Sequence, residues 1–126
     1  MASNRERLAR QAYAVMRIVF GAMFMTYGLQ KFGFLGGQAV PLGGMRGLAA
    51  VIELLGGLLI AVGFFTRPAA FISSGEMAAA YFMTHQPRGV LPVQNQGIPA
   101  VLFCFAFLYF AARGAGIWSV DGERDR

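Results

Sequence analysis

Four charged side chains fall inside or at the edge of long apolar stretches: Arg17, Lys31, Glu53 and Glu76. An ionised side chain at the centre of a bilayer costs about 2.5 to 3.5 kcal/mol on insertion scales, so each needs a partner or a water-filled cavity. At a helical rise of about 1.5 Å per residue, Arg17 and Glu76 lie about 7 and 10 Å from the same end of their segments. We therefore predict a structural ion pair between Arg17 and Glu76.

A second polar group is expected at the other end of the same segments. Glu53 lies about 9 Å from that end by the same helical rise, and the long side chain of Lys31 can reach its carboxylate by snorkelling. A four-span topology places amide and imidazole side chains at the same end as Lys31 and Glu53: Gln30, His85, Asn95 and Gln96. A carboxylate, a cation and these groups near a loop indicate a site that binds a ligand or handles protons.

The segments that must position these residues are apolar. Of the 126 residues, 56% are hydrophobic and only 13% are charged, whereas a soluble domain has about 25% charged residues. A span needs about 20 apolar residues, and four candidates are visible, at about 12–32, 47–65, 69–83 and 98–112. The sequence thus predicts an all-α membrane protein, an antiparallel four-transmembrane-helix bundle that forms a single domain over 1–126.

Local signals fix where these helices begin and which faces they bury. Ser3 and Glu6 have capping-box spacing, which predicts a long first helix that begins near Asn4. The segment 33–46 is rich in glycine and cannot be a helix interior, whereas Thr66-Arg67-Pro68 predicts a tight connection between the second and third spans. In the first two spans, small residues share a face with the charges and allow close helix packing: Gly21, Gly28, Gly57 and Ala61.

The basic residues predict the orientation of the chain. With four spans both termini lie on one side, and that side has the larger set of basic residues: Arg5, Arg7, Arg10, Arg67, Arg113, Arg124 and Arg126. The other side has Lys31, Arg46 and Arg88. The positive-inside rule then predicts cytoplasmic termini. Because the net charge of +5 flanks apolar spans, it indicates membrane topology and no nucleic-acid partner.

The cysteine and histidine counts limit the redox cofactors. The chain has one cysteine, Cys104, and one histidine, His85. It therefore cannot by itself form an intrachain disulfide, hold an iron–sulfur cluster on several thiolates, or bind haem through two imidazoles. No metal site and no covalently bound cofactor are expected, so any electron carrier is organic, diffusible or held by a partner.

A series of loosely spaced motifs follows in order along nearly the whole chain: Arg17-x3-Gly21-x2-Phe24-x3-Gly28-x2-Lys31-Phe32-Gly33, Glu53-x3-Gly57-x5-Gly63, Thr66-Arg67, Asn95-x-Gly97 and Gly116-x-Trp118-Ser119-x-Asp121. Together they resemble the DoxX family of small bacterial membrane proteins. The resemblance implies a four-span inner-membrane bundle with cytoplasmic ends, often a small subunit of a membrane redox assembly. Relatives include a subunit of a thiosulfate:quinone oxidoreductase. Where members often read Asn-Gly-Gly-Glu, this chain reads Asn95-Gln96-Gly97-Ile98-Pro99.

The polar cluster and the resemblance lead to one main functional hypothesis. The chain is predicted to be an integral membrane subunit of a redox assembly that provides or borders a quinone site and docks a redox partner. Glu53 and Lys31 are the predicted catalytic residues, a quinone is the predicted cofactor, and the predicted quinone-binding residues are Gln30, His85, Asn95 and Gln96. The predicted partners are the lipid bilayer and the other subunits of a membrane redox complex. A non-catalytic accessory subunit of a larger complex and a small proton-coupled transporter are the alternatives.

Overall fold

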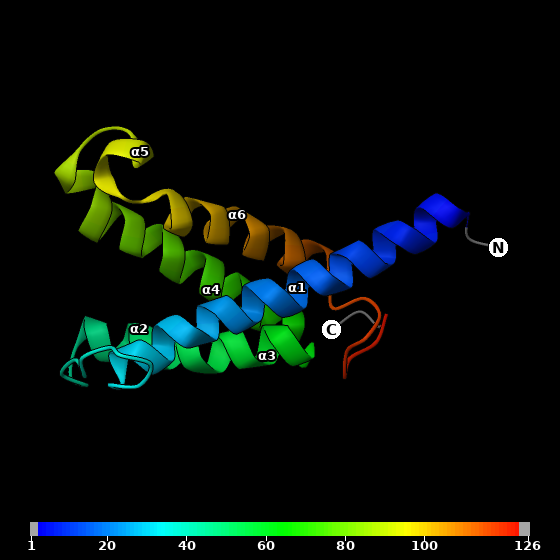
Figure 1. Ribbon diagram of the computed structural model, residues 1–126, viewed down its shortest axis with the longest axis horizontal. Helices are drawn as coiled ribbons and strands as arrows, with labels where there is room; N and C mark the ends of the chain where they lie inside the picture. The colour runs from blue at the N-terminus through cyan, green and yellow to red at the C-terminus, as the bar shows by residue number, and fades with distance from the viewer. Residues whose placement is uncertain (1–2, 124–126) are drawn as a thin grey trace.

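The computed structural model describes residues 3–123, and the chain folds into helices joined by irregular connections (Figure 1). The all-α fold class is thus confirmed. In chain order, the elements are α1 (Asn4–Lys31), α2 (Met45–Val51), η1 (Ile52–Gly56), α3 (Gly57–Val62), α4 (Thr66–Ala80), η2 (Tyr81–His85), η3 (Gln86–Arg88), α5 (Pro92–Asn95) and α6 (Ile98–Arg113). Arg124 and Arg126, which enter the predicted orientation, lie outside the described residues.

Two of the four main helices contain a π-helical segment. The second helix runs without a break from Met45 to Val62, because α2, η1 and α3 follow one another directly. The third consists of α4 and η2 and reaches His85, so it is longer at both ends than the predicted 69–83. The second helix ends three residues before the predicted boundary, because Gly63 takes a left-handed conformation, with φ +73°, that terminates it.

The first helix begins where the capping residues predict. Ser3 is the N-cap of α1, and its hydroxyl accepts a hydrogen bond of 3.1 Å from the backbone N–H of Glu6. The helix then continues for 28 residues to Lys31. The glycine-rich segment after it is irregular up to Met45, as predicted.

The four main helices run antiparallel in chain order and form two pairs (Figure 1). The first helix lies along η1 and α3, whereas α4 lies along α6. The pairs meet where η1 and α3 contact α4, and they diverge toward the end opposite the two termini, where α2 and η2 lie well apart. This divergence makes room for the site described below.

Aromatic rings from α1 and α6 fill much of the interior. Phe24 on α1 is fully buried, and its ring centroid lies 4.7 Å from that of Phe107 and 5.7 Å from that of Phe103. The outer surfaces carry large apolar side chains instead, among them Phe71 and Phe105. α1 and the helix 45–62 are long and apolar enough to cross a membrane. An apolar exterior around an aromatic core is the pattern expected of a protein whose solvent is lipid.

Candidate functional site

A partly buried ion pair joins the first two helices near the end at which the helix pairs diverge. The ammonium of Lys31 donates to both carboxylate oxygens of Glu53, at 2.7 and 2.6 Å. Glu53 is 1% exposed. Gly28, one turn before Lys31, allows the close packing that brings the two side chains together, because a Cβ atom there would lie 2.5 Å from the backbone nitrogen of Leu54. The predicted contact between Lys31 and Glu53 is thus present.

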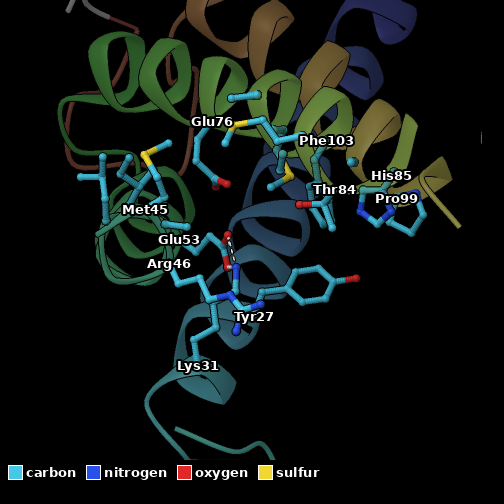
Figure 2. Close-up of a pocket in the computed structure, with 18 of the residues that line it drawn as sticks. Tyr27, Lys31, Met45, Arg46, Glu53, Glu76, Thr84, His85, Pro99 and Phe103 are labelled. Atoms are coloured by element: carbon cyan, nitrogen blue, oxygen red, sulfur yellow. Dashed lines mark hydrogen bonds and ion pairs between the residues drawn. The ribbon is translucent and has the colours of Figure 1, made fainter. Parts of the chain in front are cut away.

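The ion pair lies in the wall of a cavity of about 630 Å³ between the two helix pairs (Figure 2). Much of the lining is apolar, with the aromatic rings of Tyr27 and Phe103 and the thioethers of Met45, Met77 and Met83. The polar lining side chains are those of Lys31, Arg46, Glu53, Glu76, Thr84, His85 and Gln96. A ligand in this space would meet a few polar groups within a mostly apolar surface, as is usual for small-molecule sites.

Both π-helical segments border this cavity. The segment η1 carries Ile52 and Glu53, and η2 carries Met83, Thr84 and His85, all of which line it. A π-turn inserts an extra residue into a helical turn and re-aims the side chains beside it, and such turns are frequent at functional sites. Two on facing helices at one cavity support its assignment as the candidate functional site.

The predicted ion pair between Arg17 and Glu76 is wrong. The carboxyl group of Glu76 points across the cavity toward Glu53 (Figure 2), and its charged neighbours are Glu53 and Lys31. The depth estimate failed because the third helix begins at Thr66 and continues through η2. Glu76 therefore lies about 15 Å from the start of its helix, at ten residues of about 1.5 Å each.

Arg17 is instead the centre of a structural contact at the opposite end of the bundle. Its guanidinium is fully buried and donates to five backbone carbonyls, those of Ile60 and Ala61 in α3 and those of Ala115, Ile117 and Trp118 in the C-terminal segment. The charge of Arg17 is thus stabilised by the partial negative charges of carbonyl oxygens, and not by the predicted carboxylate of Glu76. Arg17 fastens the segment after α6 against α3.

The C-terminal segment also covers the turn between the second and third helices. Asp121 is buried, and its carboxylate accepts a hydrogen bond of 3.1 Å from the backbone N–H of Thr66, the first residue of α4. A carboxylate at this position also interacts favourably with the helix dipole. The backbone N–H groups of Val120 and Asp121 donate to the carbonyls of Val62 and Gly63. These residues of the family-like motifs hold the fold together, far from the cavity.

The structure brings two of the four predicted binding residues to the cavity. His85 and Gln96 both line it. The Nδ1 atom of His85 lies 3.1 Å from the carbonyl oxygen of Asn95, which orients the ring. Gln96 takes a left-handed backbone conformation, with φ +60°, directly after α5. Both side chains therefore lie where the third and fourth helices are connected.

The other two predicted binding residues are not at the cavity, which corrects their assignment. Gln30 is exposed and outside the lining, because one residue along a helix turns the side chain by about 100° from that of Lys31. Asn95 is buried, and all its side-chain polar atoms are bonded within the connection: its amide nitrogen donates to the hydroxyl of Tyr81 and the carbonyl of Gly89, and its oxygen accepts from the N–H of Gly97.

Asn95→Ala is expected to loosen the connection between the third and fourth helices. The substitution removes three hydrogen bonds, of 2.8 to 3.1 Å, in a buried position, and each buried group left without a partner costs about 1 to 3 kcal/mol. Thermal unfolding of the purified protein should show a lower Tm. Gln94→Ala, one residue earlier and exposed, is the control, and a Tm of Asn95→Ala equal to that of the control would contradict this role.

Sequence reasoning missed several lining residues, above all Tyr27, Arg46, Thr84 and Phe103. The position of Tyr27 could have been found, because it lies four residues before Lys31 and so shares its helix face. Thr84 had no such signal, because the π-turn that positions it is not visible in the sequence.

Comparisons with known proteins identify a family and two relatives of the chain. The family model for DoxX matches residues 12–86, which run from α1 to the start of η3 and contain the ion pair and Glu76. The chain is 40% identical over 129 residues to an uncharacterized protein of Haemophilus influenzae, which covers 96% of both chains. It is 31% identical over 120 residues to the inner membrane protein YqjF of Escherichia coli, which covers 85% of this chain and 87% of the relative. No solved structure matches.

Proposed function

The chain belongs to the DoxX family of membrane proteins, and from that premise we propose that it is an integral inner-membrane subunit of a redox assembly. In this proposal it provides or borders a quinone site and docks a redox partner. One observation carries the proposal, namely the ion pair of Lys31 and Glu53 in the wall of a mostly apolar cavity. Cytoplasmic termini are part of the proposal and would place this cavity in the periplasmic half of the bundle.

The polar groups of the cavity suit the headgroup of a quinone. A quinone offers two carbonyl oxygens as acceptors, and the ammonium of Lys31 has three N–H donors, of which the bonds to Glu53 occupy two. The third can therefore be donated to a ligand. The rings of Tyr27 and Phe103 supply aromatic surface for a planar headgroup, and the methionine side chains adapt to its outline.

The shape of the cavity suits a ligand that enters from the bilayer. Its volume of about 630 Å³ is large enough for a headgroup with the start of an apolar tail. Apolar side chains on the rim are more than half exposed on the outer faces of α2, α4 and η2: Met45, Leu48, Ile72 and Met83. A ligand dissolved in lipid would meet these apolar side chains at the rim before it reaches the ion pair.

The proposed chemistry is the reduction of a quinone to a quinol. The quinone takes up two electrons from a redox subunit docked to this chain, together with two protons, and each carbonyl oxygen becomes a hydroxyl. Lys31 holds one carbonyl oxygen by a charge-assisted hydrogen bond. Glu53 exchanges a proton with the ligand, which is the task of a general acid–base residue positioned within hydrogen-bonding reach.

Lys31→Met is expected to weaken quinone binding. The affinity of the purified protein in lipid nanodiscs for a short-chain ubiquinone should fall about tenfold or more, because a hydrogen bond to a charged group contributes about 1.5 to 3 kcal/mol. Equilibrium dialysis measures this affinity. Gln30→Ala, beside Lys31 and outside the cavity, is the matched control. Equal affinities of Lys31→Met and Gln30→Ala, or no binding to the wild-type protein, would rule out this site.

Glu53→Gln tests the proton role separately. In native membranes that contain the redox partner, the rate of quinone reduction should fall, because an amide cannot carry the proton that the carboxyl group transfers. The amount of the protein in the membrane, measured by immunoblot, must match that of the wild type. An unchanged rate would exclude Glu53 from proton transfer.

An accessory role without catalysis is the second candidate. Apolar side chains are strongly exposed on the two long connections at the cavity end, namely Phe34, Leu42, Val90 and Val93. Such side chains outside the main helices suit contact with another subunit. Purification from native membranes in a mild detergent separates the two candidates. A protein that binds quinone when pure supports the quinone site, whereas one that copurifies with redox subunits but binds no quinone supports the accessory role.

A further inference from the structure

We propose that Glu76 is a second proton-exchanging residue of the cavity, and that Glu53 and Glu76 hold one proton between their carboxyl groups. The inference rests on the proposed function for its consequence, which is that this proton is delivered to the bound quinone. It assigns to a residue of α4 a role that the sequence patterns did not indicate.

The two carboxyl groups come from different helices and face each other across the cavity. Glu53 is held by η1 in the first helix pair, and Glu76 by α4 in the second (Figure 2). The carboxyl group of Glu76 points toward that of Glu53, and the two groups interact electrostatically. A hydrogen bond between two carboxyl groups requires a proton on one of them, because an ionised carboxylate has no donor.

Among residues 3–123, Lys31 is the cation in an ion pair with this carboxyl pair, and it offsets one negative charge. Lys31 is the cation that bonds Glu53, and both oxygens of Glu53 are used in that contact. The Oε1 atom of Glu76 is buried and has no hydrogen-bond partner among residues 3–123. The other titratable side chains of the lining are those of Tyr27, Arg46 and His85. Arg46 is exposed, and the Nδ1 atom of His85 is occupied by the carbonyl of Asn95.

A proton is therefore the partner that the structure leaves for Glu76. Two neighbouring carboxylates in a poorly solvated site repel each other, and one lysine compensates for only one of them. A shared proton removes the excess charge and supplies the donor that the contact between Glu53 and Glu76 needs. It also places an acidic hydrogen inside the cavity, next to the ammonium of Lys31.

This proton has a defined use in quinone reduction. As the redox partner supplies two electrons, the O–H bond of Glu76 breaks and an O–H bond forms on one quinone oxygen. The second proton passes from water at the open side of the cavity through Glu53 to the other quinone oxygen. The carboxylate that remains on Glu76 takes up a new proton from the same side, so each turnover restores the pair.

Infrared spectroscopy of the protein in nanodiscs at pH 7 tests the inference directly. A protonated carboxyl group has a C=O stretching band separate from those of carboxylates and amides. We expect such a band in the wild-type protein and its loss in Glu76→Gln, whereas Glu6→Gln, which changes an exposed residue of the first helical turn, should keep it. No band in the wild-type protein, or the same band in Glu76→Gln, would overturn the inference.

Functional measurements on the same variant separate this inference from the proposed quinone site. Glu76→Gln keeps the shape of the side chain, so short-chain ubiquinone should bind within about threefold of the wild-type affinity, while reduction in membranes with the partner should slow at least about tenfold. If the wild-type protein shows the band but binds no quinone, the proposed function fails and the proton pair remains. If Glu76→Gln does not fold, Glu76→Asp should shift the band, and an unshifted band would overturn the inference.

Discussion

Arg17→Ala is expected to remove most of the folded protein. The guanidinium of Arg17 is fully buried and donates to five backbone carbonyls, two of them in α3 and three in the C-terminal segment. Alanine removes the guanidinium donor from all five carbonyls, in contacts that are buried or partly buried. Breaking a buried charged contact by removing one side costs about 3 to 5 kcal/mol, which is a large part of a total stability of about 5 to 15 kcal/mol.

The measurement is the Tm of the detergent-solubilised protein together with its amount in the membrane. Arg17→Lys should rescue only part of the loss, because one ammonium cannot reach carbonyls that are spread over both sides of a planar guanidinium. Arg10→Ala, two turns earlier on α1, is the control, since the nitrogen of Arg10 lies 3.9 Å from Glu123 in an exposed contact that contributes about 0 to 1 kcal/mol. Similar Tm values for Arg17→Ala and Arg10→Ala would contradict the structural role.

Much of the architecture followed from patterns that depend on local sequence. The four main helices could be predicted because apolar runs of nearly membrane-spanning length are rare outside such helices. Ser3 identified the start of α1, and the small residues Gly21, Gly28 and Gly57 identified the faces that pack closely. The contact between Lys31 and Glu53 could be predicted because both residues lie near the same end of adjacent helices. An error of one or two residues in a helix boundary then changes their relative depth little.

The misassigned residues depend on features that leave no mark in the sequence. The partners of Arg17 are backbone carbonyls, which every residue has, so no side-chain pattern indicates them. The position of Glu76 depends on a third helix that begins at Thr66, three residues before the apolar run, and continues through η2. Asn95 was assigned to the cavity by its side of the membrane alone, but the turn around it binds all its polar atoms. Long-range packing decides each of these cases.

The two ends of the bundle therefore have different roles, one in stability and one at the cavity, although both carry residues of the family-like motifs. Arg17, Thr66 and Asp121 fasten the C-terminal segment at one end, while Lys31 and Glu53 face the cavity at the other. A substitution at the first end is expected to lower stability and to reduce activity only through the amount of folded protein. A conservative substitution at the second end is expected to change activity at nearly constant Tm.

Gly57→Val is expected to separate the first two helices. The closest approach between α1 and α3 is made by backbone atoms, because a Cβ atom on Gly57 would lie 2.4 Å from the nitrogen of Met25 and 2.7 Å from the carbonyl oxygen of Gly21. Backbone atoms of two helices cannot rotate away as a side chain can, so the helices must move apart. We expect a loss of about 3 kcal/mol, the upper end of the usual range for overpacking, seen as a lower Tm.

The same movement should weaken the ion pair between Lys31 and Glu53. Gly28, one turn before Lys31, packs on Leu54, the residue after Glu53. Gly75→Ala is the matched control with the opposite sign. Among residues 3–123, no heavy atom outside its own helix backbone and its chain neighbours lies within 4 Å of the place its Cβ would take. Alanine stabilises a helix interior by about 0.5 to 1 kcal/mol over glycine. Gly57→Val should thus lower both the Tm and the affinity for quinone, whereas Gly75→Ala should raise the Tm alone. Unchanged quinone affinity in a folded but destabilised Gly57→Val protein would show that the cavity does not depend on this helix contact.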